Sequence, residues 1–240
     1  MELIGHLSVE EIQAALPGRP VRSYPALVST DAAARAWARE GAEEGAIVAA
    51  GYQASPRGRG GLEWEVGPDA LAFSLVLRPR LPAEREGWLY VVAACGIADF
   101  VGKEARIEWP DEVRAGGARA GAAGVHAELG PAGIEWATIS VLLCHAPPPR
   151  APLLARAVEA IEARYRSPSV GVLADYLHRC GTIGRHVTAR LIPLGPGGVQ
   201  VTGTAARVLT DGALVIETDD GRRIAVRPQS LGDLSITPGV

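Results

Sequence analysis

The sequence predicts an α+β protein in which helices flank a mixed or antiparallel sheet, followed by a small antiparallel barrel. In residues 1–182, segments with the apolar period of a helix alternate with short apolar strands. From residue 183 onward only short strands are expected, separated by tight turns that contain glycine. Hydrophobic residues make up 48% of the 240 positions, which is enough to bury a core. We therefore expect two domains, residues 1–182 and residues 183–240.

The expected helices are identified by their caps and by apolar residues spaced three or four positions apart. Ser8 and Glu11 form a capping box at the start of the first helix, and Asp31 is the expected cap of the second. The segment that follows Pro82 is long and mostly apolar. The expected helices are residues 9–16, 31–43, 82–101, 153–165 and 170–178.

The expected strands are short apolar or alternating runs bounded by turn-forming residues. In the first domain they are residues 21–27, 46–52, 71–77, 105–109, 122–129 and 134–144. A glycine- and alanine-rich loop is expected at residues 114–120, before a hairpin formed by the last two strands. In the barrel the expected strands are residues 187–193, 199–209, 213–217 and 223–226.

The composition argues against several classes of partner. The formal net charge is -3 and no run of lysine or arginine occurs, so nucleic acid is not an expected partner. No apolar run is long enough to cross a bilayer, and the first residues lack the features of a signal peptide, so no membrane partner is expected. The three cysteines are far apart and form no CxxC pair, which indicates reduced thiols and a cytoplasmic location.

No metal site is predicted. The five histidines are scattered, without a pair at helical ligand spacing. The acidic residues Glu108, Asp111 and Glu112 are compatible with a magnesium ion, but also with a solvated strand end.

Short motifs at regular places in the chain resemble those of the biotin–protein ligase family, in its catalytic and C-terminal domains. The resemblance covers residues 7–234, and it depends on the order and spacing of the motifs more than on any one of them. The motifs are Ser29-Thr30, Tyr52-Gln53, Arg57-Gly58-Arg59-x-Gly61-x-x-Trp64, Trp109-Pro110, residues 124–129 and residues 182–187.

The resemblance implies a biotin/lipoate ligase-like fold with an SH3-like barrel after it. It also implies a chemistry in which biotin and ATP, with Mg, form biotinyl-adenylate, and the biotinyl group passes to a lysine of a carboxyl-carrier domain. Some members carry a DNA-binding helix-turn-helix ahead of this region; we expect none here and no DNA binding. A homodimer is compatible with the edge strands of the fold.

The resemblance also assigns roles to individual residues. Arg57 and Arg59 are the candidate catalytic residues, because arginine forks onto phosphate. The implied ligand-binding residues are Ser29, Thr30, Gln53, Gly58, Gly61, Trp64, Trp109 and Gly124. Taken without the resemblance, the arginine–glycine loop is more typical of a solvated surface turn. Ser29-Thr30 is equally typical of plain helix capping. His126 lies beside the candidate pocket, either facing a ligand or satisfied in the core.

The chain departs from the family pattern where positive charge is needed. The family's Lys-Trp-Pro-Asn-Asp is replaced by Glu108-Trp109-Pro110-Asp111-Glu112, and Gly121 stands where a lysine is expected. The only lysine of the chain is Lys103. Joining a carboxylate to a triphosphate brings two anions together, and this chemistry therefore requires cations at the site. The replacements remove cations from it.

The floor of the expected pocket is altered as well. A glycine-rich family strand matches residues 138–142, where Thr138 and Ser140 would share one face with Leu142. A packed site does not accept added side chains freely. We therefore predict a pseudoenzyme candidate with a degenerate adenylation site, which binds a small molecule or a protein. The alternatives are an active biotin–protein ligase and a related chemistry on lipoate or octanoate.

Overall fold

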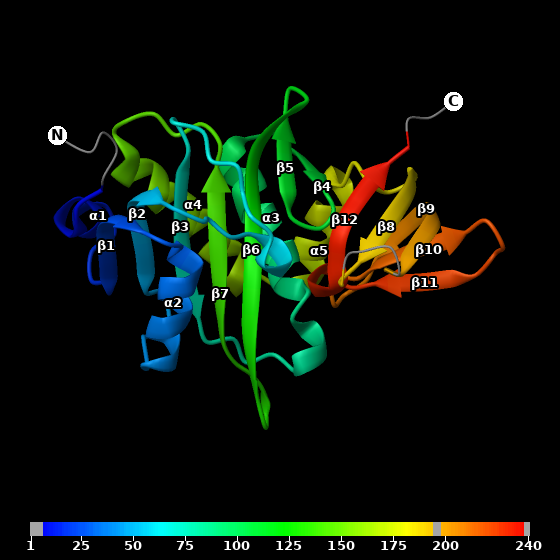
Figure 1. Cartoon of the computed structure of the whole chain (residues 1–240), viewed down its shortest axis with the longest axis horizontal. Coiled ribbons are helices and arrows are strands. Elements are labelled where there is room, and N and C mark those ends of the chain that lie inside the picture. The colour runs from blue at the N-terminus through cyan, green and yellow to red at the C-terminus, as the bar shows by residue number, and fades with distance from the viewer. Residues whose placement is uncertain (1–6, 194–197, 238–240) are drawn as a thin grey trace.

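The computed structural model describes residues 7–193 and 198–237 of the chain. Its larger unit is a seven-stranded sheet with the strand order β1-β2-β3-β7-β6-β5-β4 (Figure 1). Strands β1 and β2 are parallel, and the other neighbouring strands are antiparallel. The strands of this sheet are β1 Val21–Leu27, β2 Ile47–Gln53, β3 Leu71–Leu77, β4 Arg106–Glu108, β5 Glu112–Ala115, β6 Ala118–Gly130 and β7 Gly133–Leu143.

Helices cover both faces of this sheet. Helix α2 lies on one face, against β3 and β7, while α3 and α4 pack together on the other (Figure 1). The helices are α1 Val9–Ala15, α2 Thr30–Arg39, α3 Trp88–Val101, α4 Arg150–Arg166 and α5 Ser169–Arg179, with short 3-10 turns η1 Arg59–Gly61, η2 Ala83–Arg85 and η3 Pro228–Ser230. The predicted mixed sheet flanked by helices is confirmed.

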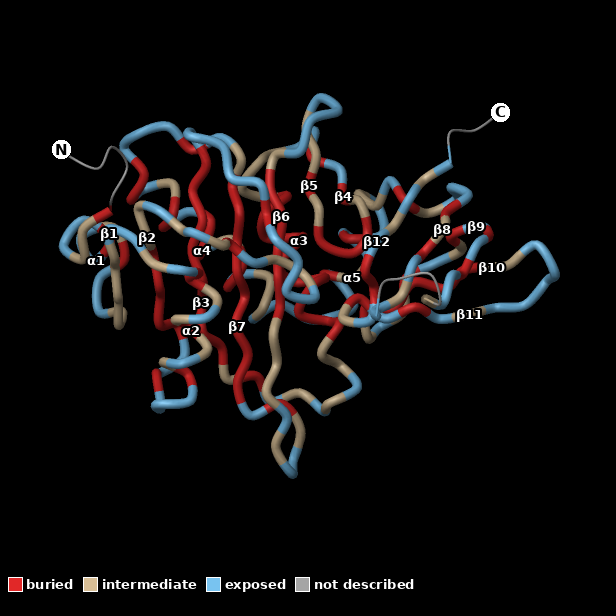
Figure 2. Tube along the Cα trace, viewed as in Figure 1, coloured by how far each residue is buried: buried red, intermediate tan, exposed pale blue. Residues whose placement is uncertain are grey.

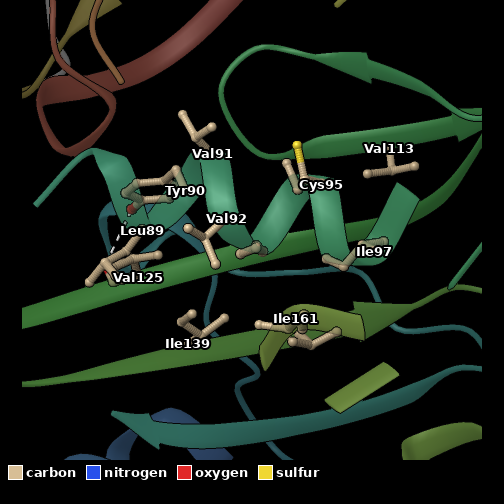
Figure 3. Packing of buried hydrophobic residues seen from close by; sticks show 14 of the residues in the cluster. Leu89, Tyr90, Val91, Val92, Cys95, Ile97, Val113, Val125, Ile139 and Ile161 are labelled. Atoms are coloured by element: carbon tan, nitrogen blue, oxygen red, sulfur yellow. Dashed lines mark hydrogen bonds between the residues drawn. The ribbon is translucent and has the colours of Figure 1, made fainter. Parts of the chain in front are cut away.

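The core is centred on α3, in which every residue from Trp88 to Ala98 is buried. Its side chains pack against the sheet at Val125 and Ile139 and against Ile161 of α4 (Figure 3). The two helices approach so closely that a Cβ on Gly96 would lie 2.5 Å from the Cα of Ile161. Glycine at this crossing therefore permits a close helix packing.

A second sheet follows, with the order β11-β10-β9-β8-β12. Its strands are β8 His186–Leu191, β9 Gln200–Val208, β10 Leu214–Thr218, β11 Arg223–Val226 and β12 Leu231–Ile236. In the described residues β11 and β12 are its two edges, so the sheet is open. The predicted SH3-like barrel is therefore not confirmed.

Several element boundaries differ from the sequence prediction. Ser29, and not Asp31, is the N-cap of α2. The helix ends at Arg39, before residue 43, and Gly41 adopts a positive φ two residues later. The predicted loop at 114–120 is instead the tight turn between β5 and β6, in which Gly116 and Gly117 both have positive φ. Strand β12 was not predicted. Figure 2 shows that burial runs along β3 and most of β7, as expected for strands covered on both faces, whereas in β6 it is confined to residues 121–125.

Candidate functional site

A loop that follows β2 folds back over β6 and closes one end of the α2 face. Trp64 covers Gly58, so that no side chain fits at that position. Gly58 in turn lies on Gly124 of β6, where an added Cβ would be 2.7 Å from the Gly58 carbonyl carbon. Two glycines of the predicted motifs are thus in contact because neither carries a side chain. The structure places Gly58 in contact with both Trp64 and Gly124, three of the residues singled out in the sequence.

A hydrogen-bonded network fills the sheet surface beneath α2. The backbone N–H of Thr30 donates to Oε1 of Gln53 at 2.7 Å, and the Thr30 hydroxyl donates to the same oxygen at 3.2 Å. Ser74 donates to the Thr30 hydroxyl at 3.0 Å and lies 2.8 Å from the Ser140 hydroxyl. The polar side chains at the start of α2 are therefore largely satisfied by protein groups.

Asp31 continues this network toward β7. Thr138 donates to Oδ1 of Asp31 at 3.1 Å, and Ser140 donates to the same atom at 3.4 Å. The predicted shared face of Thr138, Ser140 and Leu142 is confirmed, and all three are buried. The other oxygen, Oδ2, lies 3.4 Å from Nη1 of Arg35, one helical turn further along α2. The two hydroxyl groups therefore hold the Asp31 carboxylate in position through hydrogen bonds.

Five of the predicted ligand residues line three separate cavities. Trp109, together with Arg59, lines one of about 330 Å³. Gly58, Gly61 and Gly124 line a cavity of about 320 Å³, whereas Gln53 lines another of about 440 Å³. Trp64 packs on apolar residues of the sheet, among them Leu142. Ser29 is buried, and its hydroxyl has no hydrogen-bond partner in the described part of the chain.

Trp109 contacts the second sheet. Its indole N–H donates to the Gly212 carbonyl at 2.9 Å, and its backbone N–H donates to Thr182 at 2.9 Å. The ring is buried. It therefore joins the two sheets beside the cavity that it lines with Arg59.

The two candidate catalytic arginines have different surroundings. Arg59 donates from Nε to Oδ1 of Asp111 at 2.9 Å and from Nη1 to the carbonyl of Leu231 in β12. Burial raises the pKa of the Asp111 carboxyl, and Arg59 opposes that rise. Arg57 is exposed and donates to the Gly61 carbonyl at 3.1 Å. Arg59 therefore ties the loop to the second sheet, while Arg57 stays accessible to solvent.

The remaining charges near Trp109 form ion pairs. Arg114 lies 2.7 Å from a carboxylate oxygen of Glu108 and 3.5 Å from one of Glu112. Arg119 also pairs with Glu112. Within residues 7–193 and 198–237, no group of three or more His, Cys, Asp or Glu side chains is arranged to hold a metal ion. The described structure therefore gives no support to the magnesium interpretation of Glu108, Asp111 and Glu112.

Gly121 does not belong to the loop face of the sheet. A Cβ there would lie 2.8 Å from Cγ2 of Ile97, a core residue of α3. A lysine at position 121 would therefore point toward the core, and the absence of one there says little about the charge of the loop face.

Several residues of the 320 Å³ cavity were not singled out as ligand-binding from the sequence. They are Asp31, Arg35, Gly60, Glu86, Tyr90, Val125 and Gln229. The i, i+4 spacing of Asp31 and Arg35 was a usable signal. Glu86 and Gln229 are distant in sequence, and only the fold brings them together. His126 also lines this cavity; burial and the nearby Arg35 lower its pKa below the usual value.

Comparison with known proteins gives one sequence relative and several structural ones. No family model matches the chain. The bifunctional ligase/repressor BirA of Bacillus subtilis (strain 168) is 31% identical over 118 residues, a match that covers 45% of this chain and only 36% of that relative.

Among the described residues, no helix has the length and apolar character needed to cross a bilayer.

The structural relatives match over most of the chain. A biotin protein ligase from Aquifex aeolicus, in complex with biotin and ATP, has a TM-score of 0.67 and 17% identity, covering 91% of this chain and 99% of that one. A biotin protein ligase-like protein of unknown function from Silicibacter sp. has a TM-score of 0.64 and 15% identity, covering 86% and 94%.

A biotin acetyl coenzyme A carboxylase synthetase from Helicobacter pylori, with bound biotinylated ATP, has a TM-score of 0.60 and 17% identity, covering 87% and 99%. At these identities the matches establish the fold. Together with the 118-residue relationship, they confirm the resemblance of this chain to the biotin–protein ligase family.

Proposed function

We propose that the chain is a biotin–protein ligase relative whose adenylation activity is reduced or lost, and which acts by binding a small molecule or a partner protein. The observation that carries the proposal is the pairing of the arginines around the loop. Arg59 is bonded to Asp111, Arg114 to Glu108 and Glu112, and Arg119 to Glu112. A carboxylate and a triphosphate would have to compete with carboxylates of the protein for these cations.

The residues present fit biotin and ATP poorly. Asp31 and Glu86 place carboxylates on the cavity beside Gly58 and Gly124. At an effective dielectric of about 20, two like charges 4 Å apart repel by roughly 4 kcal/mol. Such repulsion would weaken the binding of a ligand carboxylate or phosphate in this cavity. We therefore derive no adenylation step for this chain.

A working biotin–protein ligase that modifies a carboxyl-carrier domain is the second candidate. Arg57 favours it, because this exposed loop arginine has no carboxylate partner among the described residues and is available to a phosphate. The close contact of Gly58 with Gly124 also supports this candidate, because the loop lies over β6 at two glycines to which the resemblance assigns ligand binding. The division at residue 182, the homodimer and the roles of the other motif residues stay predictions.

Calorimetric titration with biotin, with and without ATP and magnesium, tests the proposal. We expect no saturable heat with either ligand and no exchange of pyrophosphate into ATP. Biotin binding that ATP strengthens would contradict it and would favour the active ligase. In that case Arg57→Ala should abolish the ATP effect, while Arg80→Ala, at an exposed arginine that does not belong to the loop after β2, should preserve it.

A further inference from the structure

The cavity of about 320 Å³ between α2, β6 and the loop is bounded by groups from six parts of the chain. Asp31 and Arg35 come from α2, Gly58 and Gly60 from the loop, and His126 from β6. Its other walls come from Glu86 in the segment before α3, from Tyr90 of α3 and from Gln229 of the 3-10 turn η3. This volume is at the lower end of the range of small-molecule sites, so a compact ligand fits.

Carboxylates outnumber cations on the cavity wall. Asp31 and Glu86 are its carboxylates, and Arg35 is its one cation among the described residues. Arg35 is already held by Asp31, with 3.4 Å between Nη1 and Oδ2. Burial and the nearby Arg35 lower the pKa of His126 below its ordinary value, which disfavours the charged form of this side chain.

Glu86 is the carboxylate with the least compensation. It is half-buried, and in the part of the chain that the structure describes it forms no ion pair. Burial raises the pKa of its carboxyl, and the exposed Arg227 only partly opposes this. A half-buried carboxylate without a bonded cation is a favourable partner for a cationic donor that replaces the lost water.

We propose that this cavity binds its ligand through a cationic amino or amidinium group, with Glu86 as the principal acceptor and Asp31 as the second. The inference rests on the proposed small-molecule role and names the charge class of that ligand. Asp31 is held in place for this purpose by the hydroxyl groups of Thr138 and Ser140. Val125 and the backbone of Gly124 offer apolar contact to the rest of the molecule.

A matched pair of probes tests the sign of the charge. Benzylamine and benzoate are similar in size and opposite in charge at pH 7.5, and ligand-observed NMR measures the binding of each to the full chain. We expect benzylamine to bind at millimolar concentration or below and benzoate not to bind. Glu86→Gln should weaken benzylamine by about tenfold, the typical effect of losing a charged hydrogen bond.

Glu84→Gln is the matched control for Glu86→Gln. Glu84 is exposed, lies two residues away and does not line the cavity, so its replacement removes the same charge without touching the site. We expect it to change the affinity by less than about twofold, as for a screened surface charge. Asp31→Asn tests the second acceptor and should weaken benzylamine by a smaller factor, because Arg35 already shares Asp31. An unchanged thermal unfolding midpoint in Glu86→Gln shows that the fold is intact.

The outcomes separate this inference from the proposed function. Binding of benzoate in preference to benzylamine would overturn the inference. So would the absence of binding by either probe at 10 mM, which is roughly the weakest dissociation constant expected from such contacts. Equal weakening by Glu84→Gln and Glu86→Gln would also overturn it, because the effect would then be general electrostatics. In each of these cases, the absence of biotin and ATP heat would still support the loss of adenylation.

Discussion

The two faces of the seven-stranded sheet are filled differently: one is continuously apolar, whereas the α2 face combines a polar network with two smaller apolar clusters. On the α3 and α4 face, apolar side chains such as Phe73, Ile139 and Val141 are fully buried in one continuous cluster. On the α2 face the same strands carry Ser74, Thr138 and Ser140, which form hydrogen bonds with one another or with Asp31. One strand, β7, thus alternates between an apolar core and a polar network.

This difference separates the α3 and α4 face, whose packing stabilises the fold, from the α2 face, which carries the polar side chains. The apolar face gains from burial, which contributes without directional demands. The polar face gains little net stability, since its hydrogen bonds replace bonds to water. A polar network beneath a cavity is thus better explained by positioning than by stability, and mutations on the two faces should differ in kind.

The largest expected loss of stability lies on the apolar face. Phe73→Ala should lower the free energy of unfolding by about 4 kcal/mol, because the residue is fully buried and a cavity would remain. Phe73→Leu keeps more of the volume and should cost less than about 2 kcal/mol. Urea unfolding of both variants measures the difference. Equal losses for the two would show that this position collapses freely and is not tightly packed.

Breaking the buried pair beside the loop should have the next largest effect. Arg59 and Asp111 have side-chain exposures of 13% and 7%. Arg59→Met leaves Asp111 without its cation and should cost about 3 kcal/mol, whereas the double variant Arg59→Met/Asp111→Leu should cost much less. A double-mutant cycle by urea unfolding gives the coupling. Additive losses would show that the pair contributes no coupling energy.

The pattern of the sequence predicted the frame of the fold and only part of the site. Apolar periodicity placed most elements, because burial on one side imposes it. It missed β12, a strand with little apolar alternation, and it predicted a closed barrel that the open second sheet does not confirm. At the site, local motifs identified Gly58 and Gly124, because their close approach needs glycine. Glu86 and Gln229 carry no local signal, since their role depends on long-range packing.

A smaller effect is expected where α4 is tied to the segment before β1. Arg19 donates from Nη2 to Oε2 of Glu162 at 2.6 Å, and Glu162 is only 4% exposed. Burial alone would raise the pKa of this carboxyl, but Arg19 and Arg166 outweigh burial and hold the pKa below 4.5. The charge therefore stabilises the fold above the unfolded-state pKa, and this contribution is lost as the pH falls through the folded-state value.

Glu162→Gln should accordingly cost about 2 kcal/mol at pH 7, as expected for a buried charged hydrogen bond. The difference from the wild type should shrink as the pH falls below 4.5. Urea unfolding at pH 7, 5 and 3.5 measures this change. Glu159→Gln, at an exposed position of the same helix, serves as the control. A difference that stays constant across this range would show that the Glu162 charge is not the cause.

The smallest effect on stability, and the most informative for the site, is expected at Gly124. An added Cβ would lie 2.7 Å from the carbonyl carbon of Gly58, so Gly124→Ala must displace the loop from β6. The loop is peripheral to the core, and the free energy of unfolding should therefore fall by only about 1 kcal/mol.

The displaced loop should instead become accessible to trypsin. Cleavage after Arg57 should be several times faster in Gly124→Ala than in the wild type, as mass spectrometry of native-state digests can measure, because local opening governs such cleavage. Gly67→Ala is the matched control, since a Cβ there meets no atom within 4 Å and its φ is not positive. An unchanged rate in Gly124→Ala would mean that the loop does not depend on β6 for its position. The polar face would then lack the closing contact that separates it from the apolar one.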